Sequence, residues 1–181
     1  VSNGVSASLI WPVLDNIEDL RRLILDFNGL MQLIRVFSSY QEDIIVQVIT
    51  DDELCQRIVN TKEIFWFIAN KLTHSEQKNR LLQPILTDMA KWRRLVTSID
   101  DVINLVRKFP EHKQALAERL LLDMAERNLA SEDIDDYYLL MQILPNHREQ
   151  LLCKLLIRFS NGLKSDKERY YGFVRFVKNN P

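Results

Sequence analysis

Turn-forming residues are scarce in this sequence. Its 181 residues include only four glycines and five prolines. A β-sandwich or barrel usually needs such a residue at each of its many turns, so the composition argues against these folds. Hydrophobic residues make up 46% of the chain, enough to bury a sizeable core without a metal or a disulfide. We therefore predict long helices packed into a single domain.

Clustered cysteines and long apolar runs are also lacking. Cys55 and Cys153 each lie within an apolar helical pattern, with no C-x-x-C or Cys/His cluster beside them. We interpret both as buried thiols in a reducing, cytosolic compartment rather than as a disulfide or metal ligands. No apolar run approaches the roughly 18 residues that span a bilayer. Residues 1–8 lack the features of a signal peptide, which suggests a piece of a longer protein.

An excess of one charge is missing as well. The 24 lysines and arginines nearly balance the 25 aspartates and glutamates, giving a formal net charge of −1. The basic residues are scattered in ones and twos. A nucleic-acid-binding protein would gather them into a basic patch. The sequence therefore favours neither nucleic acid nor an anionic membrane surface as a partner.

What the sequence does contain is an internal repeat. Pro12 aligns with Pro84 at a displacement of 72 residues, and half of this is 36 residues, the length of one helical hairpin. Other segments align at displacements of 37 and 35 residues, as Arg57 with Arg94 and Pro110 with Pro145 do. The aligned segments are 11–24 with 83–96, 54–70 with 91–107, 108–123 with 143–158, and 137–146 with 170–179.

This repeat predicts an all-α fold, an α-solenoid of stacked helix hairpins with a repeat length of about 35 residues. Each unit has two apolar stripes, which only neighbouring hairpins can cover. Pro110 and Pro145 fit the first position of a second helix. Polar starts of first helices are Thr61, Ser98, Ser131 or Asp133, and Ser165. The approximate units are 12–26, 27–60, 61–97, 98–130, 131–164 and a partial 165–181.

Helical periodicity places the individual helices within these units. Pro84 falls inside the predicted helix 75–91, so it either kinks that helix or begins it afresh. The predicted helices span 13–26, 28–38, 41–50, 52–59, 62–72, 75–91, 98–109, 111–128, 132–144, 146–160 and 166–178.

Two polar columns recur with the repeat. His112 and His147 each follow a proline by two residues, which suits a turn or cap more than a metal site. Asp51, Asp88 and Asp123 form the second column. Because successive hairpins are spaced by roughly 10 Å, these carboxylates lie too far apart to share a proton or a metal. We expect them instead to have a repeated structural role, such as pairing with nearby arginines.

Arginines supply the first set of candidate binding residues. Arg22, Arg57 and Arg94 share a column, and guanidinium groups recognise carboxylate and phosphate bidentately. If these side chains project from one face, they form a basic stripe that could hold an acidic peptide or a phosphoinositide headgroup. The alternative is that each forms a salt bridge with adjoining acidic residues.

Paired aromatic residues supply the second set. Consecutive helical positions point about 100° apart, so both members of a pair cannot lie in the core. Trp66, Tyr138 and Tyr171 are the members that we expect at a binding surface, where Trp and Tyr often serve as anchors. The alternative is packing against a neighbouring repeat.

The sequence contains no G-x-S-x-G, H-E-x-x-H or phosphate-binding glycine loop, and a repetitive chain without them favours a non-catalytic role that needs no cofactor or metal. Its units resemble degenerate helical repeats of large secreted effectors from intracellular bacteria such as Legionella. Residues 91–123 carry this resemblance best, although tetratricopeptide and ankyrin signatures are missing. The resemblance implies delivery into a host cell by a non-classical secretion system, and contact with a host protein or membrane.

These observations lead us to expect a protein-interaction scaffold. The partner would be a protein, which the resemblance implies is a host protein. The alternative is a regulatory or phosphoinositide-localising helical domain attached to an enzyme elsewhere in the same polypeptide.

Overall fold

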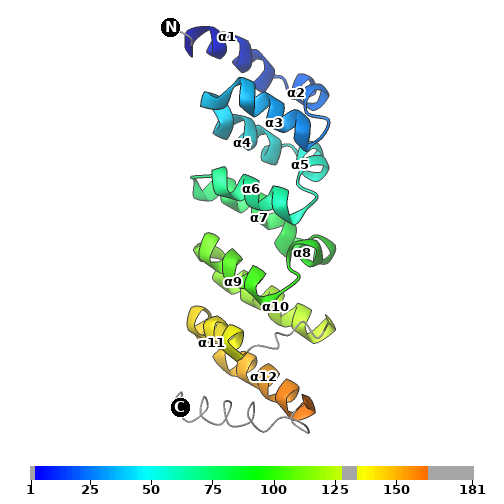
Figure 1. The fold of residues 1–181 in the computed structure, drawn as a ribbon, viewed down its shortest axis with the longest axis vertical. Helices are drawn as coiled ribbons and strands as arrows, with labels where there is room; N and C mark the ends of the chain where they lie inside the picture. Colours follow the sequence, from blue (N-terminus) through cyan, green and yellow to red (C-terminus); the bar gives the residue numbers. More distant parts are fainter. Residues whose placement is uncertain (1–2, 128–133, 163–181) are drawn as a thin grey trace. The chain divides into compact units, whose positions relative to one another are not determined.

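The structure is a computed structural model that describes residues 3–127 and 134–162. Within these ranges the chain forms twelve α-helices and three short 3-10 turns, without a β-strand (Figure 1). The predicted all-α class is therefore confirmed. The backbone divides into two compact units, residues 1–95 and 96–181, each with its own buried side chains.

The first unit contains eight of these helices. Three of them, α2, α5 and α8, have only seven residues each and lie along one side of the unit (Figure 1). A 3-10 turn, η1 (Ser38–Tyr40), leads into α4. The helices are α1 (Asn3–Leu14), α2 (Ile17–Leu23), α3 (Phe27–Val36), α4 (Gln41–Thr50), α5 (Asp52–Ile58), α6 (Lys62–Lys71), α7 (Ser75–Thr87) and α8 (Met89–Leu95).

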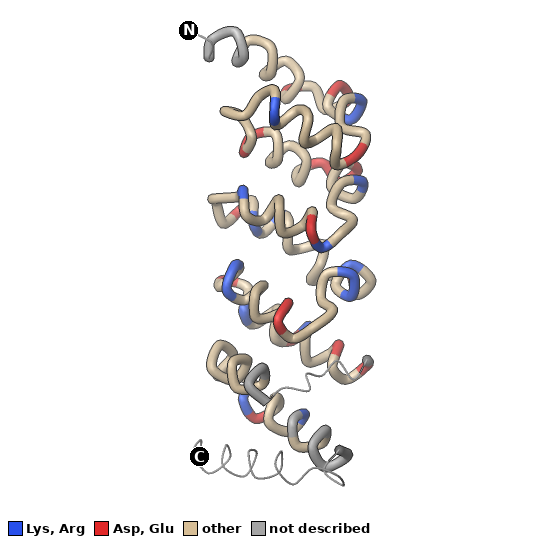
Figure 2. Tube along the Cα trace, in the orientation of Figure 1, with Lys and Arg blue, Asp and Glu red and all other residues tan. Residues whose placement is uncertain are grey.

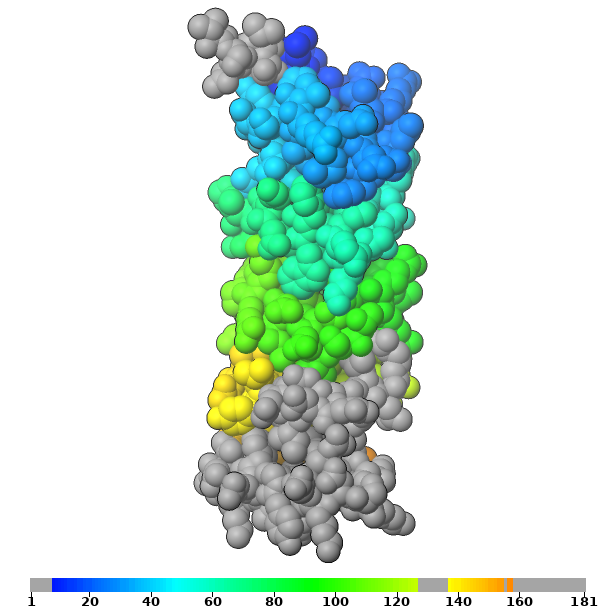
Figure 3. Space-filling model, in the orientation of Figure 1, coloured from blue at the N-terminus to red at the C-terminus, as the bar shows by residue number. Residues whose placement is uncertain are grey.

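Helix α4 lies at the centre of this unit. It contacts α1, α5, α6 and α7. Its residues Ile44, Ile45, Val48 and Ile49 are all buried, because neighbours cover more than one side of the helix. In the space-filling view the colours of this unit follow chain order, so neighbouring segments on the visible face are close in sequence (Figure 3).

A capping residue with extended backbone begins each of the three short helices. Asn16, Asp51 and Asp88 have φ/ψ values of −114/97°, −91/117° and −110/113°. The side chain of each accepts a hydrogen bond from a backbone N–H in the first turn of the following helix. The predicted continuous helices over 13–26 and 75–91 were therefore wrong, since each is interrupted at one of these residues.

The prolines do not mark these breaks. Pro12 and Pro84 lie inside α1 and α7, and α7 continues beyond Pro84 to Thr87. The chain leaves the helix at the cap that follows the proline. Pro110 and Pro145, in contrast, start helical segments as predicted, although each begins a 3-10 turn rather than an α-helix.

The second unit is built around helix α9. Ile99, Val102, Leu105 and Val106 of α9 are buried, and α9 contacts both α10 and α11. Ser98 caps α9 in a reciprocal capping box with Asp101. The elements are α9 (Ile99–Lys108), η2 (Pro110–His112), α10 (Lys113–Arg127), α11 (Ile134–Ile143), η3 (Pro145–His147) and α12 (Arg148–Gly162).

The predicted helix caps can now be compared with the structure. Thr61 and Ser98 cap α6 and α9 as predicted. Asp123 is fully buried within α10, so it does not share the capping role of Asp51 and Asp88. The predicted starts at Ser131, Asp133 and Ser165 lie outside the described residues.

The expectation of two buried thiols was wrong. Cys153 is exposed on α12, and Cys55 on α5 is partly exposed. Both are free thiols.

Burial of one tryptophan gives a direct test of the core. Trp92 on α8 is fully buried, whereas 44% of Trp11 on α1 is exposed. We expect Trp92→Ala to lower the free energy of unfolding by about 3–5 kcal/mol, because it leaves a cavity. Trp11→Ala is the control and should cost clearly less. Urea denaturation measures both, and equal losses would contradict the packing described for α8.

Candidate binding pocket

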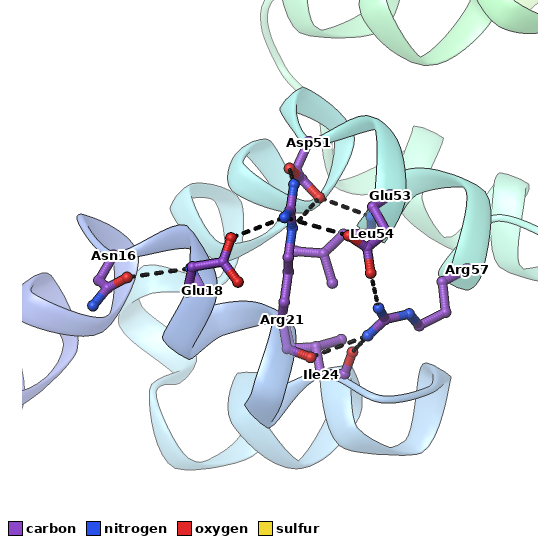
Figure 4. A network of polar contacts seen from close by, with 8 residues as sticks. All are labelled: Asn16, Glu18, Arg21, Ile24, Asp51, Glu53, Leu54 and Arg57. Carbon is purple, nitrogen blue, oxygen red and sulfur yellow. Dashed lines mark hydrogen bonds and ion pairs between the residues drawn. The ribbon is translucent and has the colours of Figure 1, made fainter.

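Polar contacts link the short helices α2 and α5, and we call this place the α2–α5 joint (Figure 4). The α5–α8 joint is the place where α5 and α8 line the same pocket. The Arg21 guanidinium of α2 contacts the Asp51 carboxylate through two nitrogens, with Nη2–Oδ2 at 2.6 Å and Nε–Oδ1 at 3.2 Å. Its Nη1 also lies 2.9 Å from Glu18 and 3.3 Å from Glu53. One arginine therefore connects the end of α2 to the cap of α5.

This contact changes the ionisation of both groups. The hydrogen bonds from Arg21 are the main reason that the pKa of Asp51 lies below its usual range. The backbone N–H of Leu54 and the charge of Arg57 act in the same direction, while partial burial of the carboxylate opposes them. The same contact raises the pKa of Arg21. The joint thus stabilises the ionised form of Asp51.

Arg57 adds further contacts to the α2–α5 joint. Its Nη1 donates to the backbone carbonyl oxygens of Arg21 and Ile24, at 3.0 and 3.2 Å. These carbonyls lie at the C-terminal end of α2, where they lack partners within the helix. The Nη2 of Arg57 pairs with Glu53, one turn earlier on α5. Arg57 is therefore occupied by contacts within the unit.

The α5–α8 joint has an equivalent capping residue, Asp88, but different side chains at several other positions. Aligning the caps Asp51 and Asp88 places Arg57 on Arg94. Glu53, which pairs with Arg57 in the first joint, corresponds to Ala90. Helix α8 has no acidic residue, whereas α2 and α5 carry both signs of charge (Figure 2). The second joint thus lacks the carboxylate that occupies the arginine of the first.

A pocket of about 370 Å³ opens at this second joint. Its walls come from α5, α6, α7 and α8, all in the first unit, and from the loop after α5. Leu81 and Ile85 of α7 are buried at its apolar side, and Pro84 lies between them in sequence. The apolar lining residues are Val59, Phe65, Leu81, Pro84, Ile85 and Leu95.

The charged residues of the pocket are mainly cationic. Lys62, Lys91 and Arg94 line it together with one acidic residue, Asp52, which gives a formal charge of +2. Within the described residues, the Lys91 ammonium and the Arg94 guanidinium form no ion pair or hydrogen bond. Arg94 is also exposed. The pocket therefore combines apolar surface with two unpaired cations.

The charges of these two cations affect the ionisation of Asp88. Its pKa is lowered mainly by the backbone N–H groups of Lys91 and Ala90, and further by the charges of Lys91 and Arg94. Asp88 nevertheless serves as the cap of α8, so its oxygen is already bound by backbone donors. Asp88 thus caps α8 as Asp51 caps α5. The position equivalent to Arg21, which contacts Asp51, is occupied by Gln56 at the second joint.

Cys55 also lines the pocket. Partial burial raises the pKa of its thiol, and the nearby charge of Lys91 offsets this only in part. A thiol with a raised pKa is a poor nucleophile at neutral pH, because the thiolate is the reactive form. Cys55 is therefore a wall of the pocket rather than an activated group.

The predicted arginine stripe is only partly free. Arg22 is 80% exposed and lies 3.6 Å from Asp19, and Arg57 is engaged as described above. These two fit the salt-bridge alternative. Arg94 alone of the three lines the pocket.

The sequence analysis did not single out Lys91 or Ala90. One signal in the sequence could have indicated them, since residues 89–95 contain no acidic residue.

Trp66 and Tyr138, two of the predicted aromatic residues, are not among the residues that line the pocket. Trp66 on α6 is partly buried and packs edge to face on Phe65, with ring centroids 5.4 Å apart. Tyr138 on α11 of the second unit is 37% exposed. Tyr171 lies outside the described residues. Trp66 and Tyr138 therefore belong to different units.

The recurring histidines lie in the two 3-10 turns, as the turn interpretation expected. Among the described residues, no group of three His, Cys, Asp or Glu side chains is placed to hold a metal ion. No helix in the same part of the chain is both long and apolar enough to cross a membrane.

Comparison with protein-family profiles, curated proteins and solved structures finds nothing that matches this chain. The geometry of the pocket and its joint is therefore the basis for any functional proposal.

The Arg21–Asp51 contact makes stability depend on pH. Asp51→Asn retains a capping oxygen, as Asn16 does in α2, but removes the carboxylate charge. Because the folded pKa of Asp51 is depressed, the contribution of its charge is present above the unfolded pKa and is lost as pH falls through the folded pKa. We expect the variant to be less stable by about 1 kcal/mol at neutral pH.

Urea denaturation of both proteins over a pH series measures this difference, which should shrink towards acid pH. Asp52→Asn, which changes the exposed neighbouring carboxylate, is the control and should show a smaller effect. A difference between Asp51→Asn and the unchanged protein that stays constant with pH would contradict the assignment.

Proposed function

We propose that this chain is a non-catalytic α-solenoid scaffold that binds another protein through the pocket at the α5–α8 joint. The observation that carries the proposal is the combination, in one open pocket, of apolar walls and two unpaired cations. Protein-binding sites commonly pair an apolar anchor with a few well-placed polar groups.

The helix positions support a solenoid. Helices α3, α6, α9 and α11 each have ten residues and begin at 27, 62, 99 and 134, at intervals of 35, 37 and 35 residues. Helices α2, α5 and α8 begin at 17, 52 and 89, at the same first two intervals. In the first unit the repeat would thus be a hairpin followed by a short third helix, rather than the hairpin alone.

Stacked repeats suit a binding role because they are assembled from neighbour contacts. The frame is held by the core and caps, so side chains at a joint can vary without disturbing the fold. The α2–α5 and α5–α8 joints differ in this way, since one is filled by its own ion pairs and the other is open. The open joint is where such a scaffold would hold a partner.

The chemistry of the pocket favours binding over catalysis. Its lining has no histidine among the described residues, and partial burial raises the pKa of the one thiol, Cys55, which disfavours the reactive thiolate. The remaining charged groups are three cations and Asp52. These groups can orient a bound segment, but they offer no nucleophile paired with a base.

The partner is proposed to be a protein because the apolar walls suit side chains. The sequence resemblance to effector repeats is what suggests a host protein, and delivery into the host cytosol belongs to the same proposal.

Peptide selection tests the function. We expect a random peptide library displayed on phage, with the full chain as target, to yield peptides that compete with one another. In the Cys153→Ser protein, alkylation of Cys55 with a bulky maleimide at alkaline pH should weaken their binding by about tenfold or more, because the group fills the pocket.

The control is a protein with both cysteines changed to serine, whose peptide binding should be the same with and without the maleimide treatment. Fluorescence polarisation measures the affinities. Failure to select any peptide, or binding that is unaffected by alkylation, would contradict the proposed function.

A further inference from the structure

We propose that the pocket at the α5–α8 joint recognises a peptide carboxylate, an aspartate or glutamate next to an apolar side chain, with Arg94 and Lys91 as its direct contacts. This inference rests on the proposed binding function and specifies the chemistry of the ligand. Its argument comes from comparing the two joints of the first unit.

The α2–α5 joint shows what the column of Arg57 and Arg94 binds. Arg57 holds the carboxylate of Glu53, which lies one turn earlier on the same helix. At the α5–α8 joint the position of Glu53 is taken by Ala90, and Arg94 has no ion pair within the described residues. The second joint thus retains the guanidinium, as Arg94, but lacks a carboxylate equivalent to that of Glu53.

A second substitution between the joints adds positive charge. Lys91 of α8 corresponds to the buried Leu54 of α5, so an apolar position of the first joint becomes a cation beside the pocket. The charge of Lys91 reaches the pocket wall, since it lowers the pKa of the Cys55 thiol against the effect of burial. Two unpaired cations and an apolar wall together favour an anionic group attached to an apolar one.

The internal acids do not satisfy these cations. Asp88 is bound by the backbone N–H groups of Ala90 and Lys91 as the cap of α8. Asp52 is the acidic residue in a lining that also contains three cationic residues. The formal charge of the lining is thus +2, which favours a carboxylate, and Leu81, Ile85 and Pro84 supply apolar surface for its neighbour.

A single substitution should give Arg94 a carboxylate partner within the chain. Ala90→Glu restores, at the α5–α8 joint, the glutamate that pairs with Arg57 at the α2–α5 joint. Ala90 is exposed in the first turn of α8, where an acidic residue is also favoured by the helix dipole. We therefore expect Ala90→Glu to fold, with a melting temperature no lower than that of Ala90→Gln, and to compete with the ligand for Arg94.

The probe is an array of acetylated hexapeptide amides with Gly/Ser flanks. Each has a central pair in which Asp, Glu, Asn or Gln precedes Leu, Ile or Phe, so that every acidic peptide has an amide partner of the same shape. We expect the full chain to bind acidic members and not their amide partners. Arg94→Ala and Ala90→Glu should each weaken binding by about tenfold, the effect of roughly one charge-assisted hydrogen bond.

Two variants control for charge and size. Arg22→Ala removes the same charge at the equivalent position of α2, on a side chain that is 80% exposed and outside the pocket, and should bind as the unchanged protein does. Ala90→Gln matches Ala90→Glu in size without adding a charge, and should also bind normally. Equal binding to Ala90→Glu and Ala90→Gln would overturn the inference.

The remaining outcomes are also decisive. Equal binding of acidic and amide peptides, or no binding by any array member, would overturn the carboxylate assignment. The proposed function would still be tested separately by peptide selection.

Flotation with phosphatidylcholine vesicles containing phosphatidylinositol 4,5-bisphosphate is a parallel measurement. Vesicle binding that is lost in Arg94→Ala, without binding of acidic peptides, would replace the peptide by a phosphate headgroup and overturn the proposal.

Discussion

The arrangement of the first unit depends on one backbone feature, an extended residue that caps the start of each short helix. Asn16, Asp51 and Asp88 interrupt the helical hydrogen bonds, and their side chains then satisfy N–H groups of the next helix. Without that interruption, α7 and α8 would continue as one helix. The turn instead directs α8 back towards α6, which it contacts, and so closes one side of the pocket.

A cap of the same kind begins the second helix of each joint, Asp51 for α5 and Asp88 for α8. At the first joint, Arg21 and Arg57 link the capped helix to the preceding one through a carboxylate and through free carbonyl oxygens. At the second, Gln56 and Ala90 stand at the positions of Arg21 and Glu53. Because the core and the caps hold the backbone, these changes leave the frame in place and leave Arg94 without a partner in the described residues. Local side-chain chemistry therefore decides which joint is closed and which is open.

Much of the helical framework could be predicted from periodicity. The predicted helix 41–50 coincides with α4, and 62–72 differs from α6 by one residue. Apolar residues at helical spacing specify both helices, and the polar cap Thr61 also marks the start of α6. The breaks at Asn16 and Asp88 were missed, since an Asn or Asp within an apolar pattern reads equally well as a solvent-facing helical residue. The turns at Pro110 and Pro145 were found because proline has a restricted φ.

The sequence by itself determined the all-helical class, most helix positions and the column that contains Arg22, Arg57 and Arg94, because each follows from local spacing. Only the tertiary structure decided which member of that column is available. Arg57 meets carbonyl oxygens of α2 more than thirty residues away, whereas Arg94 meets a pocket whose walls come from four helices. Such contacts depend on how helices pack, and periodicity along one chain carries no information about the side chains that another helix brings to the same place.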